Sequence, residues 1–114
     1  NYYARFNKSV ALYKLGRYEG AIKAFEMSEE YLPRRMLWYQ IEPIKAYYKV
    51  GEYDRVLAMT KQLLENGNRA FSELYYLRGL IYEEREEEGK AEESFANAEC
   101  YNPVEYWKVN VEDL

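Results

Sequence analysis

The sequence contains no histidine and a single cysteine, Cys100. It therefore lacks the side chain most often used as a general base and most often found as a metal ligand. One cysteine cannot form a disulfide within the chain, and it cannot build a cysteine-based metal cluster. Without a histidine to activate it, Cys100 is expected to be a small, half-buried filler near the end of a helix rather than a nucleophile.

Other signatures of catalysis and of membrane anchoring are also missing. The sequence has no glycine-rich phosphate loop, no metal-ligand spacing and no nucleophile–base pair. No stretch approaches ~20 consecutive apolar residues, and the N-terminal residues include neither a starting methionine nor an apolar secretory segment. We expect no enzyme activity, no cofactor, no metal and no direct membrane insertion, and we expect the chain to be a piece of a longer protein.

Charge is unevenly distributed in a chain whose composition, 48% hydrophobic and 32% charged, is that of a soluble globular domain. Residues 1–70 carry 12 Lys/Arg against 8 Asp/Glu, whereas residues 71–114 carry 4 against 12. The acidic second part argues against a nucleic-acid partner. It is either a solvated acidic end or a contact surface for a basic partner.

An internal repeat is the strongest positive feature. Gly16-Arg17-Tyr18 and Gly51-Glu52-Tyr53 lie 35 residues apart. A third copy follows 70 residues after the first, in which Ala91, Phe95, Ala98 and Pro103 correspond to Ala21, Phe25, Ser28 and Pro33. A period of this length with two helix-like segments per unit predicts a stacked array of helical hairpins.

The repeat predicts a single all-α domain over residues 1–114, with units at about 2–36, 37–71 and 72–105. The expected helix pairs are 2–15 with 18–31, 37–50 with 53–64, and 73–85 with 87–101. Gly16 and Gly51 end the first helices of their pairs, and the glutamate run 83–88 is expected to make the third turn more helical and more exposed. Pro43 is expected to kink or interrupt its helix. Residues 106–114, in a seventh helical piece after Pro103, either cap the array or begin a fourth unit.

These residues resemble the tetratricopeptide (TPR) repeat. The match is closest in the third unit, at Tyr75, Gly79, Tyr82, Ala91, Phe95, Ala98 and Pro103, and in the first, at Leu15 to Tyr18, Ala21, Phe25 and Pro33. Lys8, Ser9, Thr60 and Pro43 depart from the family pattern. The resemblance implies an α-solenoid. The segments 33–40, 46–53 and 73–79 also look like TPR segments attached to some bacterial cysteine peptidases, and that resemblance implies a non-catalytic part of such a protein.

In the register of that family, the first helix of each unit lines a concave groove, here rich in aromatic side chains. The implied partner-binding residues are Tyr3, Phe6, Val10, Tyr13, Trp38, Ile41, Lys45, Tyr48, Tyr76, Leu80 and Glu83. Some TPR proteins clamp a carboxylate at fixed places in this groove, but here Phe6 and Val10 occupy places where the clamp needs Lys and Asn. Glu42 and Glu73 add acid at two further places.

Two interpretations of function stay open. In the first, the chain is a non-catalytic module that binds a protein or peptide segment in the aromatic groove. In the second, it is a structural or accessory domain that packs on another domain of a larger protein, such as a bacterial peptidase, or associates with itself.

Overall fold

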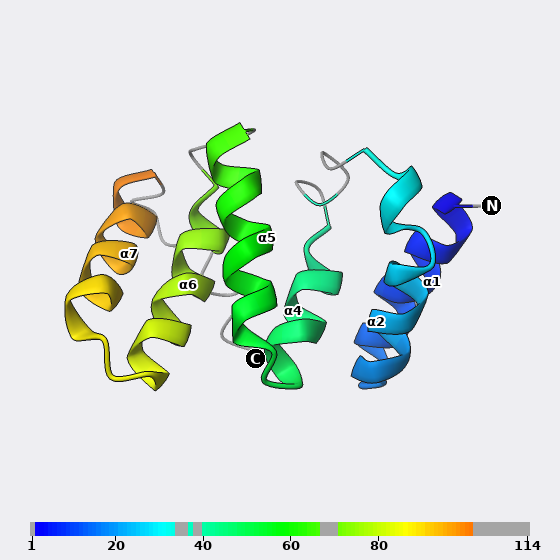
Figure 1. The fold of residues 1–114 in the computed structure, drawn as a ribbon, viewed down its shortest axis with the longest axis horizontal. Helices are drawn as coiled ribbons and strands as arrows, with labels where there is room; N and C mark the ends of the chain where they lie inside the picture. Colours follow the sequence, from blue (N-terminus) through cyan, green and yellow to red (C-terminus); the bar gives the residue numbers. More distant parts are fainter. Residues whose placement is uncertain (1, 34–36, 38–39, 67–70, 102–114) are drawn as a thin grey trace. The chain divides into compact units, whose positions relative to one another are not determined.

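The computed structural model describes residues 2–33, 37, 40–66 and 71–101. These residues form six α-helices and one short 3-10 helix, and they contain no β-strand (Figure 1). The prediction of an all-α protein is therefore confirmed for the described part of the chain. The chain divides into two compact units, Asn1–Met59 and Thr60–Leu114, and the boundary falls inside one helix. Whether the chain is one solenoid of three repeats stays a prediction.

The first unit is built around a helical hairpin. It contains α1 (Tyr2–Lys14), α2 (Tyr18–Glu26), the 3-10 helix η1 (Glu29–Tyr31), α4 (Glu42–Lys49) and the beginning of α5 (Tyr53–Asn66). Helices α1 and α2 pack on each other, and α4 packs on both (Figure 1). The fully buried side chains at the centre include Phe6, Ile44 and Tyr47. The rings of Phe6 and Phe25 meet edge to face, with centroids 6.4 Å apart.

The second unit contains the rest of α5 and a second hairpin, α6 (Ser72–Glu84) and α7 (Glu88–Tyr101). Leu74, Leu77 and Ile81 of α6 are completely buried. Gly79 lies directly against the ring of Phe95. A Cβ added at Gly79 would stand only 2.5 Å from a carbon of that ring, so a larger residue does not fit without a shift. The absence of a side chain at this position lets the two helices approach closely.

The turns after α1, α4 and α6 share one backbone geometry. In each turn one residue donates its N–H to the carbonyl three residues earlier, and the next residue donates to the carbonyl five residues earlier, at 2.9–3.1 Å. The donors are Gly16 and Arg17, Gly51 and Glu52, and Glu86 and Glu87. The first residue of each pair has a positive φ, of 80°, 84° and 60° respectively. The 35-residue period of the sequence is thus also a period of the backbone.

The third turn, at Glu86, differs from our expectation. This turn is not more helical than the others, since Glu86 adopts the left-handed conformation that glycine adopts in the first two. It is exposed, but Gly16 and Gly51 are exposed as well. A side chain in this conformation costs free energy because its Cβ crowds the backbone.

Replacing Glu86 by glycine is therefore expected to raise the free energy of unfolding by about 1 kcal/mol, since glycine adopts a positive φ without this strain. Urea denaturation of the two proteins measures the difference. Glu84→Gly is the matched control, because Glu84 has a helical backbone and glycine there should lower stability by about 0.5–1 kcal/mol. A Glu86→Gly variant as unstable as this control would show that the turn does not need glycine.

The second helix of the first hairpin ends earlier than the sequence predicted. We expected a helix over 18–31, but α2 ends at Glu26, and η1 follows after two turn residues. The buried hydroxyl of Ser28 donates to the carbonyl of Phe25 at 3.0 Å. The Ser28 amide donates to the same carbonyl at 2.9 Å. These bonds compete with the regular helical ladder and tighten the chain into the 3-10 helix.

The helix expected over 37–50 is also shorter. Helix α4 begins at Glu42, so Pro43 lies in its first turn and not in its interior. A proline at this place costs no hydrogen bond, because the first amides of a helix have no carbonyl partner within the helix. The chain is interrupted before Pro43, at Gln40 and Ile41. The expectation of a kink at Pro43 is therefore wrong, whereas the expected alternative, an interruption of the helical segment, is present just before Pro43, because Leu37 is helical and Gln40 and Ile41 are not. The seventh helical piece and the possible cap at 106–114 lie outside the described residues.

Candidate functional site

The predicted groove residues of the first unit differ in exposure. Phe6, Val10, Ile41 and Lys45 are buried, Tyr13 and Tyr48 are half-buried, and Tyr3 is 52% exposed. Trp38 lies outside the described residues. Because Phe6, Val10 and Ile41 are buried, they can support the exposed residues of a binding surface but cannot contact a partner themselves. Whether these residues bind a partner stays a prediction.

Four of the first unit's side chains form a tyrosine–lysine cluster, defined as Tyr13, Tyr18, Lys45 and Lys49. The Lys45 Nζ lies 5.3 Å from the ring centre of Tyr13, and the Lys49 Nζ lies 5.7 Å from that of Tyr18. The two rings tilt against each other with centroids 5.4 Å apart. The structure thus brings together two predicted site residues, Tyr13 and Lys45. It adds Tyr18 and Lys49, which the prediction missed.

The tyrosine pair of this cluster has a counterpart one period later. The rings of Tyr48 and Tyr53 lie 5.5 Å apart, almost the separation of Tyr13 and Tyr18. All four tyrosine side chains are half-buried. Such rings hold a large apolar area rigidly and keep a polar tip in water, which suits contact with another molecule.

In the second unit, Tyr76 and Leu80 are half-buried, and Glu83 is exposed. The Tyr76 ring packs against Phe95 at 5.4 Å. A single groove that combines these residues with those of the first unit stays a prediction.

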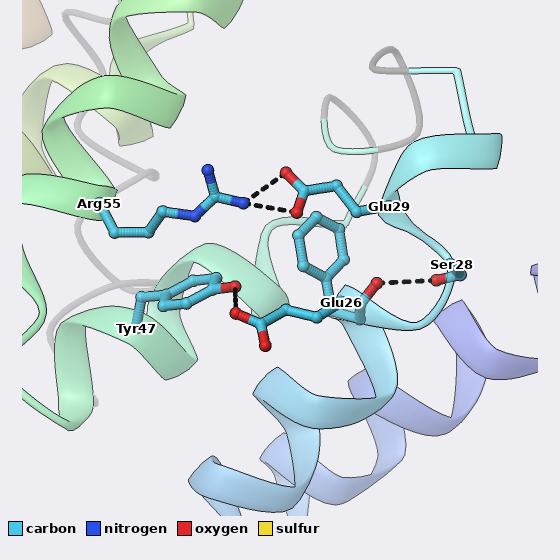
Figure 2. Close-up of polar contacts among 6 residues, drawn as sticks. Glu26, Ser28, Glu29, Tyr47 and Arg55 are labelled. Carbon is cyan, nitrogen blue, oxygen red and sulfur yellow. Dashed lines mark hydrogen bonds and ion pairs between the residues drawn. The ribbon is translucent and has the colours of Figure 1, made fainter.

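A polar network in the first unit was not predicted (Figure 2). The Tyr47 hydroxyl donates to a Glu26 carboxylate oxygen at 2.8 Å, and the Arg55 guanidinium pairs with both carboxylate oxygens of Glu29. The Arg55 guanidinium also lies over the Tyr47 ring, 5.3 Å from its centre. Two carboxylates from α2 and η1 therefore meet one hydroxyl and one cation from α4 and α5.

Burial raises the pKa of the Tyr47 hydroxyl well above its ordinary value of 10.0, and the bond to Glu26 raises it further. The unfolded chain releases the Tyr47 proton near that ordinary value, whereas the folded chain keeps it to higher pH. Unfolding therefore releases a proton above about pH 10, and stability falls as the pH rises through this range.

Tyr47→Phe is expected to remove a pH dependence of about 1.4 kcal/mol per pH unit from the free energy of unfolding above about pH 10. Urea denaturation between about pH 9 and 11 measures the slopes of the wild type and of this variant. Tyr31→Phe changes an exposed ring of the same unit and should keep the wild-type slope. Equal slopes for Tyr47→Phe and the wild type would contradict the assignment of this proton to Tyr47.

The second unit holds a pocket of about 570 Å³ between α5, α6 and α7. Its lining includes three cationic side chains, Lys61, Arg78 and Lys90, and the phenol of Tyr82. Arg78 donates to the Thr60 hydroxyl at 2.8 Å and to the Tyr82 hydroxyl at 3.1 Å. From the sequence, Tyr82 was identified only as a match to the repeat pattern, and none of the three cations was predicted as a site residue.

The remaining candidate for chemistry in the sequence is Cys100, the one cysteine of the chain. Cys100 is exposed, so our expectation of a half-buried filler is wrong. Within the residues that the structure describes, no group of three or more Cys, Asp or Glu side chains is placed to hold a metal ion. None of the helices described is both long and apolar enough to cross a membrane.

Comparison with protein-family models, with curated proteins and with solved structures gives no match.

Proposed function

We propose that this chain is a three-unit helical repeat of the TPR type that binds a protein or peptide segment and has no catalytic activity of its own. The repeated turn geometry supports the array, because equivalent bonds recur at the 35-residue period in all three turns. The tyrosine–lysine cluster is the observation that carries the binding function. It presents half-buried aromatic rings with cations held over them, on a unit whose core is filled by other side chains.

The physical basis is that of an interface anchored by tyrosine. A tyrosine ring loses little conformational freedom on binding, and its hydroxyl can bond to a partner at the rim. The half-buried cation Lys49 favours a partner that brings backbone carbonyls or an acidic side chain to this surface, and the buried Lys45 adds positive potential beneath it. The buried faces of α1, α2 and α4 then act as the scaffold.

The experiment starts with cross-linking of the chain in a cell extract and identification of the captured protein, followed by calorimetry with the purified partner. Tyr13→Ala and Tyr48→Ala should each weaken binding by about 1 kcal/mol, roughly fivefold, and should leave the helix content unchanged. Leu15→Ala is the control, because Leu15 is 70% exposed but belongs neither to the cluster nor to the Tyr48–Tyr53 pair. Unchanged affinity in both tyrosine variants would refute the proposal.

An accessory role is the second candidate, and one observation favours it. The rings of Tyr2 and Tyr31 stack at 4.3 Å although both are exposed, and Tyr3 beside them is exposed too. Exposed aromatic side chains grouped in this way suit a surface covered by another domain, such as that of a bacterial peptidase, or by a second copy. Sedimentation equilibrium of the wild type and of the double variant Tyr2→Ser/Tyr31→Ser tests self-association. If the wild type self-associates through these rings, its apparent molecular mass should exceed that of the variant.

A further inference from the structure

The two units contain the same tyrosine–cation arrangement at positions one period apart. Arg55 lies over the ring of Tyr47 at 5.3 Å, and Lys90 lies over the ring of Tyr82 at 5.6 Å. Tyr82 follows Tyr47 by 35 residues, and Lys90 follows Arg55 by 35. The first unit can therefore serve as an internal template for the second.

In the first unit, the chain itself fills the space beside this pair with carboxylates. Glu26 accepts the Tyr47 hydroxyl hydrogen, and Glu29 pairs with Arg55 (Figure 2). One period later the corresponding residues are Lys61 and Leu64. The second unit therefore lacks both acids at the two equivalent positions, and its 570 Å³ pocket is lined by Lys61, Leu64, Tyr82 and Lys90.

Arg78 strengthens the preference of this pocket for an anion. Its guanidinium donates to the Tyr82 oxygen at 3.1 Å, so the hydroxyl hydrogen can be donated elsewhere, as that of Tyr47 is donated to Glu26. Lys90 also pairs with Glu87 at 3.3 Å, but both side chains are well exposed, and such a pair is weak. Glu65 and Glu93 line the pocket too. Three cations thus face two anions in an otherwise acidic part of the chain.

We propose that the pocket between α5, α6 and α7 binds a carboxylate side chain of a peptide segment. Tyr82 and Lys90 take the places that Tyr47 and Arg55 occupy beside Glu26 and Glu29, and Arg78 is an additional cation with no counterpart in the first unit. The surrounding glutamates repel a highly acidic tail, so the segment carries one or two acids among uncharged residues. This site shares no residue with the tyrosine–lysine cluster, and each can fail without the other.

The chain supplies its own probe, a capped peptide with the sequence of residues 24–33 in which glutamine replaces Glu30, so that Glu26 and Glu29 are its two acids. Titration into the ¹⁵N-labelled full chain, followed by NMR, should shift the amide signals around Tyr82 and Lys90. A peptide with glutamine at all three glutamate positions should bind at least about tenfold more weakly, because it loses the charge-assisted bonds. Equal binding of the two peptides would overturn the proposal, and so would shifts confined to the first unit.

Lys61→Glu is the decisive variant, because it places a carboxylate at the position equivalent to Glu26. This side chain should accept the Tyr82 hydroxyl hydrogen and compete with the peptide, so binding should weaken at least about tenfold. Lys61→Gln is the matched control, and its affinity for the peptide should fall much less. Lys61 is exposed, so both variants should fold, and their NMR spectra will show it. Binding of Lys61→Glu as strong as that of the wild type would overturn the proposal.

Two further titrations define the ligand class. Free glutarate, which offers carboxylates without a peptide, should bind at least about tenfold more weakly than the peptide, because it cannot fill the apolar part near Leu64. A peptide with lysine at the glutamate positions should not bind. Glutarate that binds as tightly as the peptide, or a lysine peptide that binds in the pocket, would overturn the assignment of an acidic peptide segment.

Discussion

Phe6→Ala is expected to lower the free energy of unfolding by about 3–5 kcal/mol, a large part of the stability of a domain of this size. The Phe6 side chain is fully buried and packs edge to face on Phe25. Truncation removes its transfer free energy and leaves a cavity that the surrounding helices cannot fully close. Thermal or urea denaturation followed by circular dichroism measures the loss.

Tyr3→Ala is the control for Phe6→Ala. Tyr3 lies on the same helix, α1, and was assigned to the same predicted groove, but its side chain is 52% exposed. Its truncation should change stability by no more than about 0.5 kcal/mol. If the two variants lose similar amounts of stability, then burial does not separate supporting residues from surface residues in this unit.

Gly79→Ala is expected to destabilise the chain by about 1–3 kcal/mol, although alanine is the better helix former. The new Cβ would stand 2.5 Å from a ring carbon of Phe95, well inside van der Waals contact. That ring also packs on Tyr76, so it cannot move aside without disturbing a second aromatic contact. Urea denaturation tests this, and Phe95→Leu in the same chain should restore part of the loss.

Gly20→Ala gives the opposite sign and serves as the control. Gly20 also lies in a helix, but an added Cβ would stand 3.6 Å from a Leu12 methyl group, an ordinary contact. Alanine there should raise the free energy of unfolding by about 0.5 kcal/mol, because it lowers the conformational entropy of the unfolded chain. A Gly79→Ala variant that is also stabilised would mean that the α6–α7 packing is looser than the structure shows.

The number and order of the helices in the described residues could be predicted because the signals are local. Gly16 and Gly51 mark turns that need a positive φ, and apolar spacing marks the helices between them. Glu86 adopts the same φ without being glycine, so only the repeat revealed its turn. The early end of α2 was missed because it depends on the hydrogen bonds of one serine, Ser28, which compete with a good helical pattern.

The candidate sites were harder to predict because they join residues from separate hairpins. The family register placed Tyr13 and Lys45 on one surface, and the structure brings them together. Register alone does not show that Arg55 reaches back to Glu29, since this depends on how α5 lies beside the end of α2 and η1. A signal did exist, because the spacing of Tyr47 to Arg55 recurs unchanged from Tyr82 to Lys90.

The shared turn geometry has a kinetic consequence. Its bonds connect residues only three and five positions apart, so each turn forms without closing a long loop and at little cost in chain entropy. Helical proteins dominated by such local contacts fold within microseconds to milliseconds. The α1–α2 and α6–α7 hairpins can therefore assemble early and independently. The first turn contains glycine and the third contains glutamate at the position with positive φ, so the α6–α7 hairpin should form more slowly than the α1–α2 hairpin. Glu86→Gly should therefore increase the refolding rate more than it decreases the unfolding rate.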